Sequence, residues 1–256
     1  MKNTIFDLSG RVALVTGGSQ GLGKAMSRIF AEAGADVMIC SRSEDKLKTA
    51  AAEIAVGTGV RVEYLTTDMT RRDQVKRLAE TAVERLGKVD ILVNNAGTNV
   101  PQPIDEIDDE TWDHLLELNL TSCMALTRAL VPGMKQRRWG RVIHISSVMG
   151  LGSAAGRSPY STTKSALLGL CWASALDLGP YGITVNCIAP GPFATDLPMT
   201  LLSEEQKAIF AGRTALGRWG RPEELAGPAL LLASDAGSFI TGSVLLVDGG
   251  VMCKVF

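Results

Sequence analysis

A phenol and an ammonium group stand four residues apart at Tyr160 and Lys164, in a stretch with the pattern of a long helix from Ser158 to Gly179. Residues i and i+4 lie on one face of a helix, with Cβ atoms roughly 5–6 Å apart. A phenol is ordinarily too weak an acid for proton transfer at neutral pH, and a fixed ammonium group beside it favours the phenolate. Tyr160 is therefore a candidate general acid/base, although such a pair also occurs on helices by chance.

A third group, the hydroxyl of Ser147, follows an apolar run at 142–145 that is predicted to be a buried strand. From the end of that strand it could hydrogen-bond a substrate carbonyl or alkoxide held beside the phenol. Hydroxyl, phenol and ammonium together describe a site that protonates or deprotonates a C–O group. Serine is common at strand ends, so the surrounding elements must show whether these residues meet in one site.

The composition is that of a single α/β domain covering residues 1–256. Hydrophobic residues make up 46% of the 256 positions, which is ample for one large core. With a formal net charge of −1 the protein has no overall electrostatic attraction to nucleic acid or to an anionic membrane, so neither is an expected partner. No run approaches the about 18 apolar residues that span a bilayer, and the N-terminal residues lack a hydrophobic signal region. We expect a soluble cytoplasmic protein.

The cysteines and histidines indicate neither disulfides nor a metal site. The five cysteines are odd in number, scattered, and form no Cys-x-x-Cys pair, so we expect free thiols in a reducing compartment. The histidines, His114 and His144, have no neighbour at metal-ligand spacing, and we expect both to be structural. The cysteines are Cys40, Cys123, Cys171, Cys187 and Cys253.

A glycine-rich segment lies between an apolar run at 11–16 and a helical pattern at 24–34. Strand, glycine-rich turn and helix in this order can form a phosphate site, because backbone N–H groups at a helix N-terminus bind phosphate and glycines let a pyrophosphate approach. The glycines that stand out are Gly17, Gly21 and Gly23, a spacing that departs from Gly-x-Gly-x-x-Gly. A tight turn without a ligand is the alternative.

Further polar residues follow the next predicted strands, 36–41 and 60–66. In a dinucleotide-binding fold, an acidic residue at the tip of the second strand accepts from the ribose hydroxyls, whereas an arginine meets a 2′-phosphate. Ser41 and Arg42 stand at this tip, which favours NADP(H) over NAD(H) unless Arg42 is a solvated loop residue. Asp68, after the third strand, could accept from the adenine amino group or cap the next predicted helix, and both roles are compatible.

A fourth predicted strand, 90–93, ends in Asn94-Asn95-Ala96-Gly97. Small and amide residues at this point would let a cofactor approach the backbone, and an asparagine side chain can tie neighbouring strand ends together. The helix expected at 110–136 carries Asn119 on an apolar background, where a polar amide is costly unless it is bonded. Asn119 is therefore either a satisfied structural group or part of a proton path.

The remaining elements predict the architecture. Pro and Gly residues after the sixth strand open an irregular excursion at about 192–220 that is a natural substrate lid. Alternating strands and helices predict a Rossmann-type doubly wound α/β fold, a parallel sheet of about seven strands with helices on both faces. The helices near 120–131 and 165–178 are apolar nearly all round, which predicts a symmetric homo-oligomer. The other elements expected in this part are a strand at 182–188, a helix at 222–233 and a strand at 243–247.

In chain order, these motifs resemble the short-chain dehydrogenase/reductase family. The likeness runs from about Leu8 to Gly250, and the combination is specific although each motif alone is weak. It implies an NAD(P)-dependent oxidoreductase with a small-molecule carbonyl or alcohol substrate, and a homotetramer as the usual assembly. The motifs are Thr16-Gly17-x-x-x-Gly21-x-Gly23, Asn94-Asn95-Ala96-Gly97, Ser147, Tyr160-x-x-x-Lys164 and Pro190-Gly191.

The resemblance also implies a role for each site residue. Tyr160 would be the acid/base, Lys164 would favour its phenolate and hold the nicotinamide ribose, and Ser147 would orient the substrate oxygen. Ser147 is preferred over Ser146 because its distance from Tyr160 matches the family's spacing, and Asn119 would anchor a proton-relay water. The cofactor-contact positions are Gly17, Ser19, Gln20, Gly21, Leu22, Gly23, Ser41, Arg42, Asp68, Met69, Asn95, Ala96, Gly97, Tyr160, Lys164, Pro190, Gly191, Phe193 and Thr195.

Several functions stay open at this point. The segment 213–225 looks like that of members acting on sugar acids, such as gluconate 5-dehydrogenase, and is also similar to 3-oxoacyl-acyl-carrier-protein reductases. Arg157, in the loop before Tyr160, is either a contact for a substrate carboxylate or a solvated arginine. A non-catalytic NAD(P)-sensing module would not need the three-residue set. A serine hydrolase would need a Gly-x-Ser-x-Gly elbow, which neither Ser146 nor Ser147 occupies.

Overall fold

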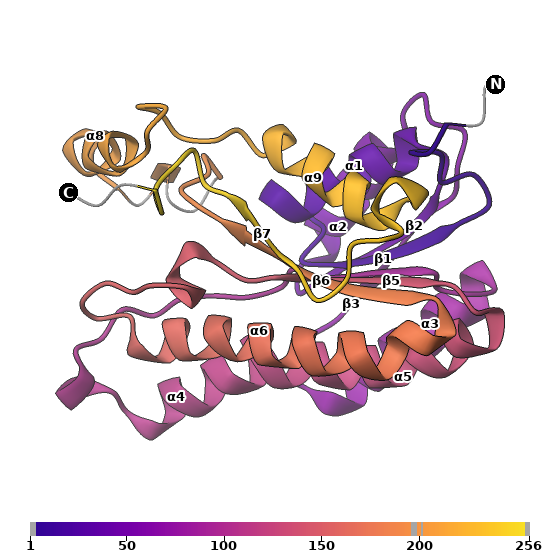
Figure 1. Cartoon of the computed structure of the whole chain (residues 1–256), viewed down its shortest axis with the longest axis horizontal. Helices are drawn as coiled ribbons and strands as arrows, with labels where there is room; N and C mark the ends of the chain where they lie inside the picture. Colours follow the sequence, from indigo (N-terminus) through magenta and orange to yellow (C-terminus); the bar gives the residue numbers. More distant parts are fainter. Residues whose placement is uncertain (1–3, 196–198, 201, 254–256) are drawn as a thin grey trace.

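The fold is built on one parallel sheet. In a computed structural model that describes residues 4–195, 199–200 and 202–253, seven strands pair in the order β3-β2-β1-β4-β5-β6-β7, with every pairing parallel (Figure 1). The strands are β1 (Val12–Thr16), β2 (Asp36–Ser41), β3 (Val62–Thr66), β4 (Ile91–Asn94), β5 (Gly140–Ile145), β6 (Ile183–Pro190) and β7 (Val244–Val247).

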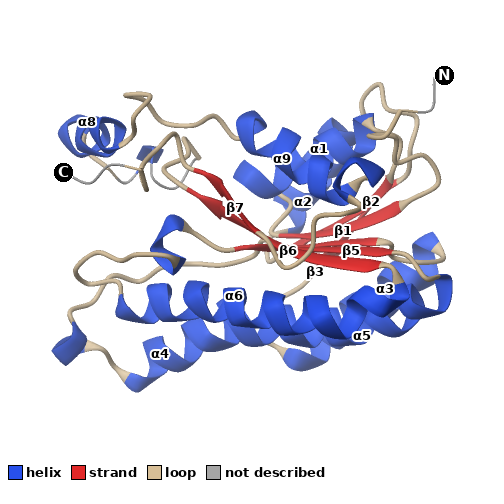
Figure 2. Ribbon diagram, in the orientation of Figure 1, coloured by secondary structure: helices blue, strands red, loops and turns tan. Residues whose placement is uncertain are grey.

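Helices connect these strands and cover the sheet on both sides. The helices are α1 (Gly21–Glu32), α2 (Glu44–Ala55), α3 (Arg72–Leu86), α4 (Asp109–Leu116), α5 (Ser122–Arg137), α6 (Ser158–Leu178), α8 (Glu204–Arg213) and α9 (Glu223–Ala233). In Figure 2, α1, α2 and α9 pack on one face of the sheet and α3, α5 and α6 on the other. None of the helices in the described ranges is both long and apolar enough to cross a bilayer.

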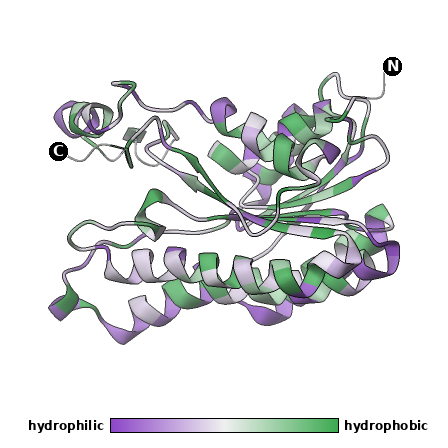
Figure 3. Ribbon diagram, in the orientation of Figure 1, coloured by the Kyte–Doolittle hydropathy of each residue, from purple (hydrophilic) through white to green (hydrophobic). Residues whose placement is uncertain are grey.

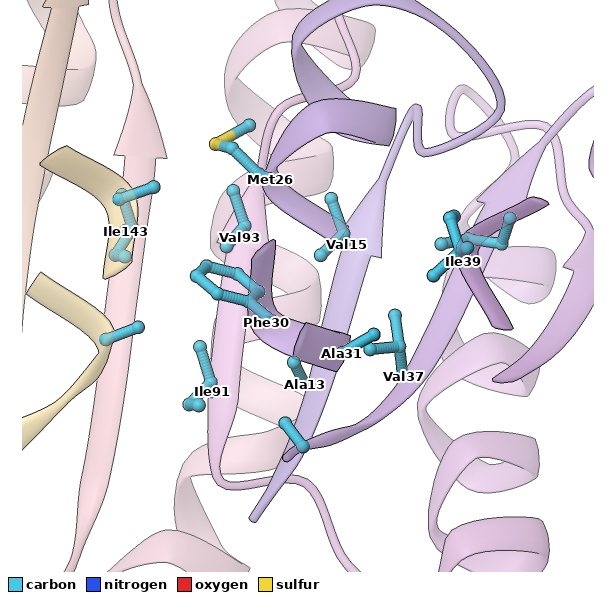
Figure 4. Close-up of a cluster of buried hydrophobic side chains, with 14 of the residues drawn as sticks. Ala13, Val15, Met26, Phe30, Ala31, Val37, Ile39, Ile91, Val93 and Ile143 are labelled. Atoms are coloured by element: carbon cyan, nitrogen blue, oxygen red, sulfur yellow. The ribbon is translucent and has the colours of Figure 1, made fainter. Parts of the chain in front are cut away.

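The central strands form because their residues are apolar on both faces. Every residue of β1, β4 and β5 is buried, as expected of parallel strands that helices cover on two sides. Met26 and Phe30 of α1 belong to one buried cluster with Val15 and Ile91 of the sheet (Figure 4). Each such side chain contributes roughly 1.5–3 kcal/mol when it is fully buried. Figure 3 shows the hydrophobic residues that recur along the strands and the helices packed on them.

The predicted fold class is confirmed, and several boundaries differ from those expected, three of them near the site. α1 begins at Gly21, so two of the three prominent glycines lie in its first turn. The helix expected at 110–136 is split into α4 and α5 by a π-helical turn at Glu117–Thr121, a single-turn insertion of the kind often found at functional sites. β6 runs to Pro190 and not only to 188, because its last residues pair with the end of β7.

The order of the strands reverses beside β1. This strand pairs with β2 on one side and β4 on the other, so the chain is wound in two directions from this point. In open α/β sheets, ligands bind outside the carboxyl ends of the strands at such a reversal. The loops after β1, β4 and β5 therefore frame the crevice in which a site is expected.

Candidate active site

Lys164 is the buried cation of the site. The residue is 4% exposed, and its Nζ donates a 2.8 Å hydrogen bond to the carbonyl oxygen of Ile145 at the end of β5. The same Nζ lies 5.6 Å from the centre of the Tyr160 ring, one turn earlier on α6. Within the described residues no carboxylate pairs with Lys164, so its positive charge acts on buried groups around it, such as His144.

The two serines after β5 make different hydrogen bonds. Ser146 donates its hydroxyl to the backbone carbonyl of Lys164 at 2.8 Å, so its proton is used within the protein. The Oγ of Ser147 accepts from the N–H of Met149 at 3.1 Å, which leaves its own proton free to donate. This difference supports Ser147 as the hydroxyl that binds a substrate oxygen.

The loop after Ser147 is fastened to α6. Ser165 donates its hydroxyl to the carbonyl oxygen of Gly150 at 2.8 Å, and the hydroxyls of Ser153 and Ser161 lie 2.7 Å apart. A Cβ on Gly150 would be 2.8 Å from the carbonyl oxygen of Lys164, so only glycine allows this approach. These contacts hold the end of β5 against the helix that carries the phenol and the ammonium group.

Asn119 is fully buried in the π-helical turn. Its Nδ2 donates to the carbonyl oxygen of Thr98 at 2.9 Å and to Oγ1 of Thr163 at 3.1 Å, while its Oδ1 accepts from the N–H of Thr98 at 3.0 Å. The side chain is thus a satisfied structural group that ties the loop after β4 to α6. Gly97 packs closely on this side chain and on Lys164. A Cβ on Gly97 would be 3.0 Å from Asn119 Oδ1 and 3.4 Å from Lys164 Nζ.

At two glycines of the glycine-rich turn there is no room for a side chain. Gly17 has a φ of +66°, and a Cβ on it would lie 2.9 Å from Nδ2 of Asn95. A Cβ on Gly23 would overlap the carbonyl oxygen of Gly17. Gln20, the N-cap of α1, makes no side-chain cap bond, so the first N–H groups of the helix are open to a ligand. This cradle fits the pyrophosphate of a dinucleotide, which accepts hydrogen bonds from such groups.

Asn95 and Thr16 join the ends of β4 and β1. The Nδ2 of Asn95 donates to the carbonyl oxygens of Thr16 at 2.8 Å and Gly17 at 3.3 Å. The hydroxyl oxygen of Thr16 accepts from the backbone N–H groups of Asn95 and Ala96. The side chain of Asn95 therefore ties strand ends, and a cofactor would meet the backbone here. Sequence reasoning missed the role of Thr16, and the signal was a hydroxyl at the end of an apolar run.

Arg42 and Asp68 lie near each other at the tips of β2 and β3. Arg42 is exposed, and its charge interacts with that of Asp68. Burial raises the pKa of Asp68, but hydrogen bonds from the N–H and hydroxyl of Thr70, at 2.9 and 2.8 Å, leave this pKa below its ordinary value. Asp68 closes the turn before α3 and does not cap the helix itself, whose N-cap is Arg71. Met69 is a core residue at 4% exposure, so its side chain is not available to a cofactor.

The segment after β6 returns to the glycine-rich turn. Thr195 lies so close to Gly21 that a Cβ on this glycine would be 3.1 Å from Thr195 Cγ2. Gly191 packs on the residue after β7, since a Cβ on it would be 2.7 Å from Cα of Asp248. The ends of β1, β6 and β7 therefore meet on one side of the crevice.

The predicted lid is only partly described. Of the residues at about 192–220 that we expect to cover a substrate, 196–198 and 201 lie outside the described residues. Phe193 forms an isolated parallel bridge with Gly220, which brings the two ends of the segment together. Its described part contains α8, at one end of the molecule in Figure 1.

Comparison with known proteins identifies the family. The model of the short chain dehydrogenase family matches residues 11–206. The chain belongs to this family. A 3-oxoacyl-(acyl-carrier-protein) reductase of Thermotoga maritima is 37% identical over 246 residues, which are 96% of this chain and 99% of the relative. A gluconate 5-dehydrogenase of Gluconobacter oxydans is 36% identical over 249 residues, which are 96% of each protein.

A solved structure supports the same assignment for this short-chain dehydrogenase. The 3-oxoacyl-(acyl-carrier-protein) reductase of Agrobacterium tumefaciens, with NADP bound, superposes with a TM-score of 0.92 at 33% identity and covers 98% of this chain and 97% of its own. The resemblance drawn from the motifs is thereby confirmed. The protein is an oxidoreductase of a family that uses NAD(P).

Beneath the site, the short-chain dehydrogenase holds a buried polar group that the motifs did not indicate. The Nδ1 of His144 on β5 lies 3.1 Å from Nδ2 of Asn94 on β4, and the Asn94 amide also donates to Thr127 at 3.2 Å. Burial, and to a smaller extent the charge of Lys164, lower the pKa of His144 to about 4. The ring is therefore neutral near pH 7, and its Nδ1 accepts the bond from Asn94.

Proposed function

We propose that this short-chain dehydrogenase is an NADP(H)-preferring oxidoreductase that interconverts a ketone and a secondary alcohol. The proposal is carried by the buried ammonium group of Lys164, which the carbonyl oxygen of Ile145 holds 5.6 Å from the ring centre of Tyr160. A fixed, unpaired cation beside a phenol stabilises the phenolate. Ser147 adds a hydroxyl with a free proton at the adjoining strand end.

In the mechanism we propose, Tyr160 gives a proton to the ketone oxygen during reduction and takes one from the alcohol during oxidation. Ser147 donates to the oxygen on which negative charge develops, an interaction worth roughly 3–4 kcal/mol in comparable sites. Lys164 stabilises the phenolate that is left. The nicotinamide cofactor supplies or receives the hydride when it is bound. A relay water at Asn119 would have to bind the backbone carbonyl, because the side-chain amide is fully bonded.

The preference for NADP(H) rests on Arg42. This exposed guanidinium stands at the tip of β2, and no carboxylate precedes Glu44 there. A guanidinium pairs with phosphate through two parallel hydrogen bonds, which suits a 2′-phosphate. The Agrobacterium reductase with NADP bound supports the same cofactor. We expect NAD(H) to be accepted less well.

We propose that the substrate is the keto form of a sugar acid. The Gluconobacter gluconate 5-dehydrogenase is similar over nearly the whole chain. Arg157, the N-cap of α6, is half-buried and pairs with no carboxylate in the described ranges, so its guanidinium is free to meet a substrate carboxylate. A 3-oxoacyl-acyl-carrier-protein reductase is the second candidate, because the Thermotoga relative with that activity in its name is similar to the same degree.

The purified chain can be assayed for NADPH oxidation with 5-ketogluconate, an acetoacetyl thioester and a simple cyclic ketone. Fastest turnover of 5-ketogluconate is the expected result, and fastest turnover of the thioester would favour the second candidate. NADPH oxidation that depends on any of these ketones would exclude a non-catalytic NAD(P)-sensing module as the sole role of the chain.

We further propose a cytoplasmic homotetramer of single-domain subunits, each with a substrate lid. Trp172 and Leu176 of α6 are 53% and 81% exposed, and large apolar side chains on one helix face suggest that another subunit covers them. The five cysteines are all free thiols, which suits a reducing compartment. Light scattering of the purified chain tests the assembly, and a monomer at micromolar concentration would exclude it.

A further inference from the structure

A groove of about 930 Å³ extends from the glycine-rich turn between α1, α2 and α9. Two of its cations, Lys24 and Arg28, each form an ion pair with a glutamate. Lys46 differs from them. It is exposed, it pairs with no carboxylate in the part of the chain that the structure describes, and its Nζ lies 3.1 Å from the amide oxygen of Gln20.

Lys46 belongs to the first turn of α2, the helix that follows the tip of β2, and the fold reads the 2′ position of a ribose at that tip. Gly18 of the glycine-rich turn packs directly on that strand, and its N–H donates to the carbonyl oxygen of Cys40 at 3.2 Å. Ser43 begins α2 by accepting from the N–H of Lys46 at 3.5 Å. Lys46 therefore lies in the first turn of α2 and Arg42 just before its N-cap, so the two cations flank the same end of this helix.

We infer that Lys46 is a second cation for the 2′-phosphate of NADP(H) and that the amide of Gln20 positions it. A neutral amide holds an ammonium group without cancelling its charge, whereas a carboxylate would cancel it. Of the three basic residues that line the groove, Lys24 and Arg28 are already paired with glutamates, so Lys46 is the one whose charge no carboxylate of the described residues neutralises. The inference rests on the proposed NADP(H) preference and adds a specificity-determining residue that lies outside the motifs.

The test measures binding and not turnover. The full chain is titrated by calorimetry with adenosine 2′,5′-bisphosphate and with 5′-AMP, two ligands that differ only in the 2′-phosphate. Lys46→Met should weaken binding of the bisphosphate about tenfold and of 5′-AMP by less than about twofold, because a charge-assisted hydrogen bond is lost only with the first ligand. Equal weakening of both ligands, or an unchanged bisphosphate affinity, overturns the role of Lys46.

Lys48→Met is the matched control. Lys48 is another exposed lysine of α2, and it is not among the residues that line the groove. Its replacement should leave the affinity for both ligands unchanged. A loss of bisphosphate affinity as large as that of Lys46→Met would show that only the overall charge matters, and it would overturn the inference.

The role of Gln20 is tested by combining substitutions. Gln20→Leu should weaken the bisphosphate a few-fold on its own, and it should cause no further loss in a chain that already carries Lys46→Met. This non-additivity is expected only if Gln20 acts through the ammonium group. Losses that add in full overturn the positioning role.

Failure of the inference and failure of the proposed cofactor preference give different results. If the unchanged chain binds the bisphosphate no more tightly than 5′-AMP, the preference for NADP(H) fails, and the role of Lys46 fails with it. If the unchanged chain prefers the bisphosphate and Lys46→Met keeps that preference in full, only the assignment of Lys46 fails.

Discussion

The two ends of the crevice are built in opposite ways. At the catalytic end, Lys164 is buried and hydrogen-bonded between α6 and β5, and its charge has no carboxylate partner in the described ranges. At the end where we propose that adenosine binds, Arg42 and Lys46 are exposed, and their neighbours are Asp68 and Gln20 from other segments. Charges interact strongly where water is excluded, and they are screened where it is not. The proposed chemistry therefore rests on a rigid arrangement, and the proposed cofactor preference on an adjustable one.

The strongest test of this contrast is Tyr160→Phe. It keeps the aromatic ring and removes the proton donor, so kcat should fall by roughly three orders of magnitude while the Kd for NADPH stays nearly constant. Steady-state kinetics and a fluorescence titration of NADPH measure the two quantities. Retention of more than about a tenth of the turnover would contradict the assignment of the acid/base.

Lys164→Met should have the next largest effect. It removes the buried charge and leaves the carbonyl oxygen of Ile145 without its donor, so kcat should fall by roughly 10²-fold and the KM for the cofactor should rise. Ser165→Ala serves as the control. It removes another hydrogen bond between α6 and the loop after β5, to the carbonyl oxygen of Gly150, and it leaves the ammonium group in place. If both variants lose turnover equally, the effect comes from the loop and not from the ammonium group.

Acidification should affect the buried layer beneath the catalytic end. The pKa of His144 is about 4 in the folded protein against an ordinary value of 6.5, so the unfolded chain takes up the proton first as the pH falls. Above about pH 6.5 the ring is neutral in both states, and this group does not lower the free energy of unfolding. As the pH falls from 6.5 toward 4, the free energy of unfolding should decrease by up to roughly 3 kcal/mol.

Urea unfolding at several pH values in this range, at one protein concentration, measures the effect. In His144→Asn the free energy of unfolding should depend less steeply on pH, because the replacement cannot be protonated. Equal slopes for the two proteins would show that His144 does not cause the loss.

The smallest effect is expected at the exposed end. Arg42→Ala should raise the KM for NADPH about tenfold and the KM for NADH by less than about twofold, since only NADPH carries the 2′-phosphate. Added salt should reduce the difference, because exposed charges are screened. Equal changes for both cofactors would argue against a contact between Arg42 and the phosphate.

The sequence was informative to different degrees at the two ends. Tyr160 and Lys164 are neighbours on one helix, so their spacing alone places them on one face. The π-helical turn at Glu117–Thr121 could not be predicted, because its residues include neither a proline nor a glycine that would mark an interruption of the helix. Gln20 and Lys46 are separated by 26 positions, and they meet only because α2 packs beside the glycine-rich turn.

By itself, the sequence determined the local features of this short-chain dehydrogenase: the apolar strands, the glycine-rich turn before α1, and the phenol and ammonium group on α6. Only the tertiary structure decided which polar groups are already satisfied. It showed that Asn119 is fully bonded, that Ser147 keeps a free proton, and that Asn95 joins strand ends. The physical reason is that sequence spacing predicts which residues are neighbours within one helix or strand. A hydrogen bond between two elements depends instead on the path of the connections and on the register of the strands.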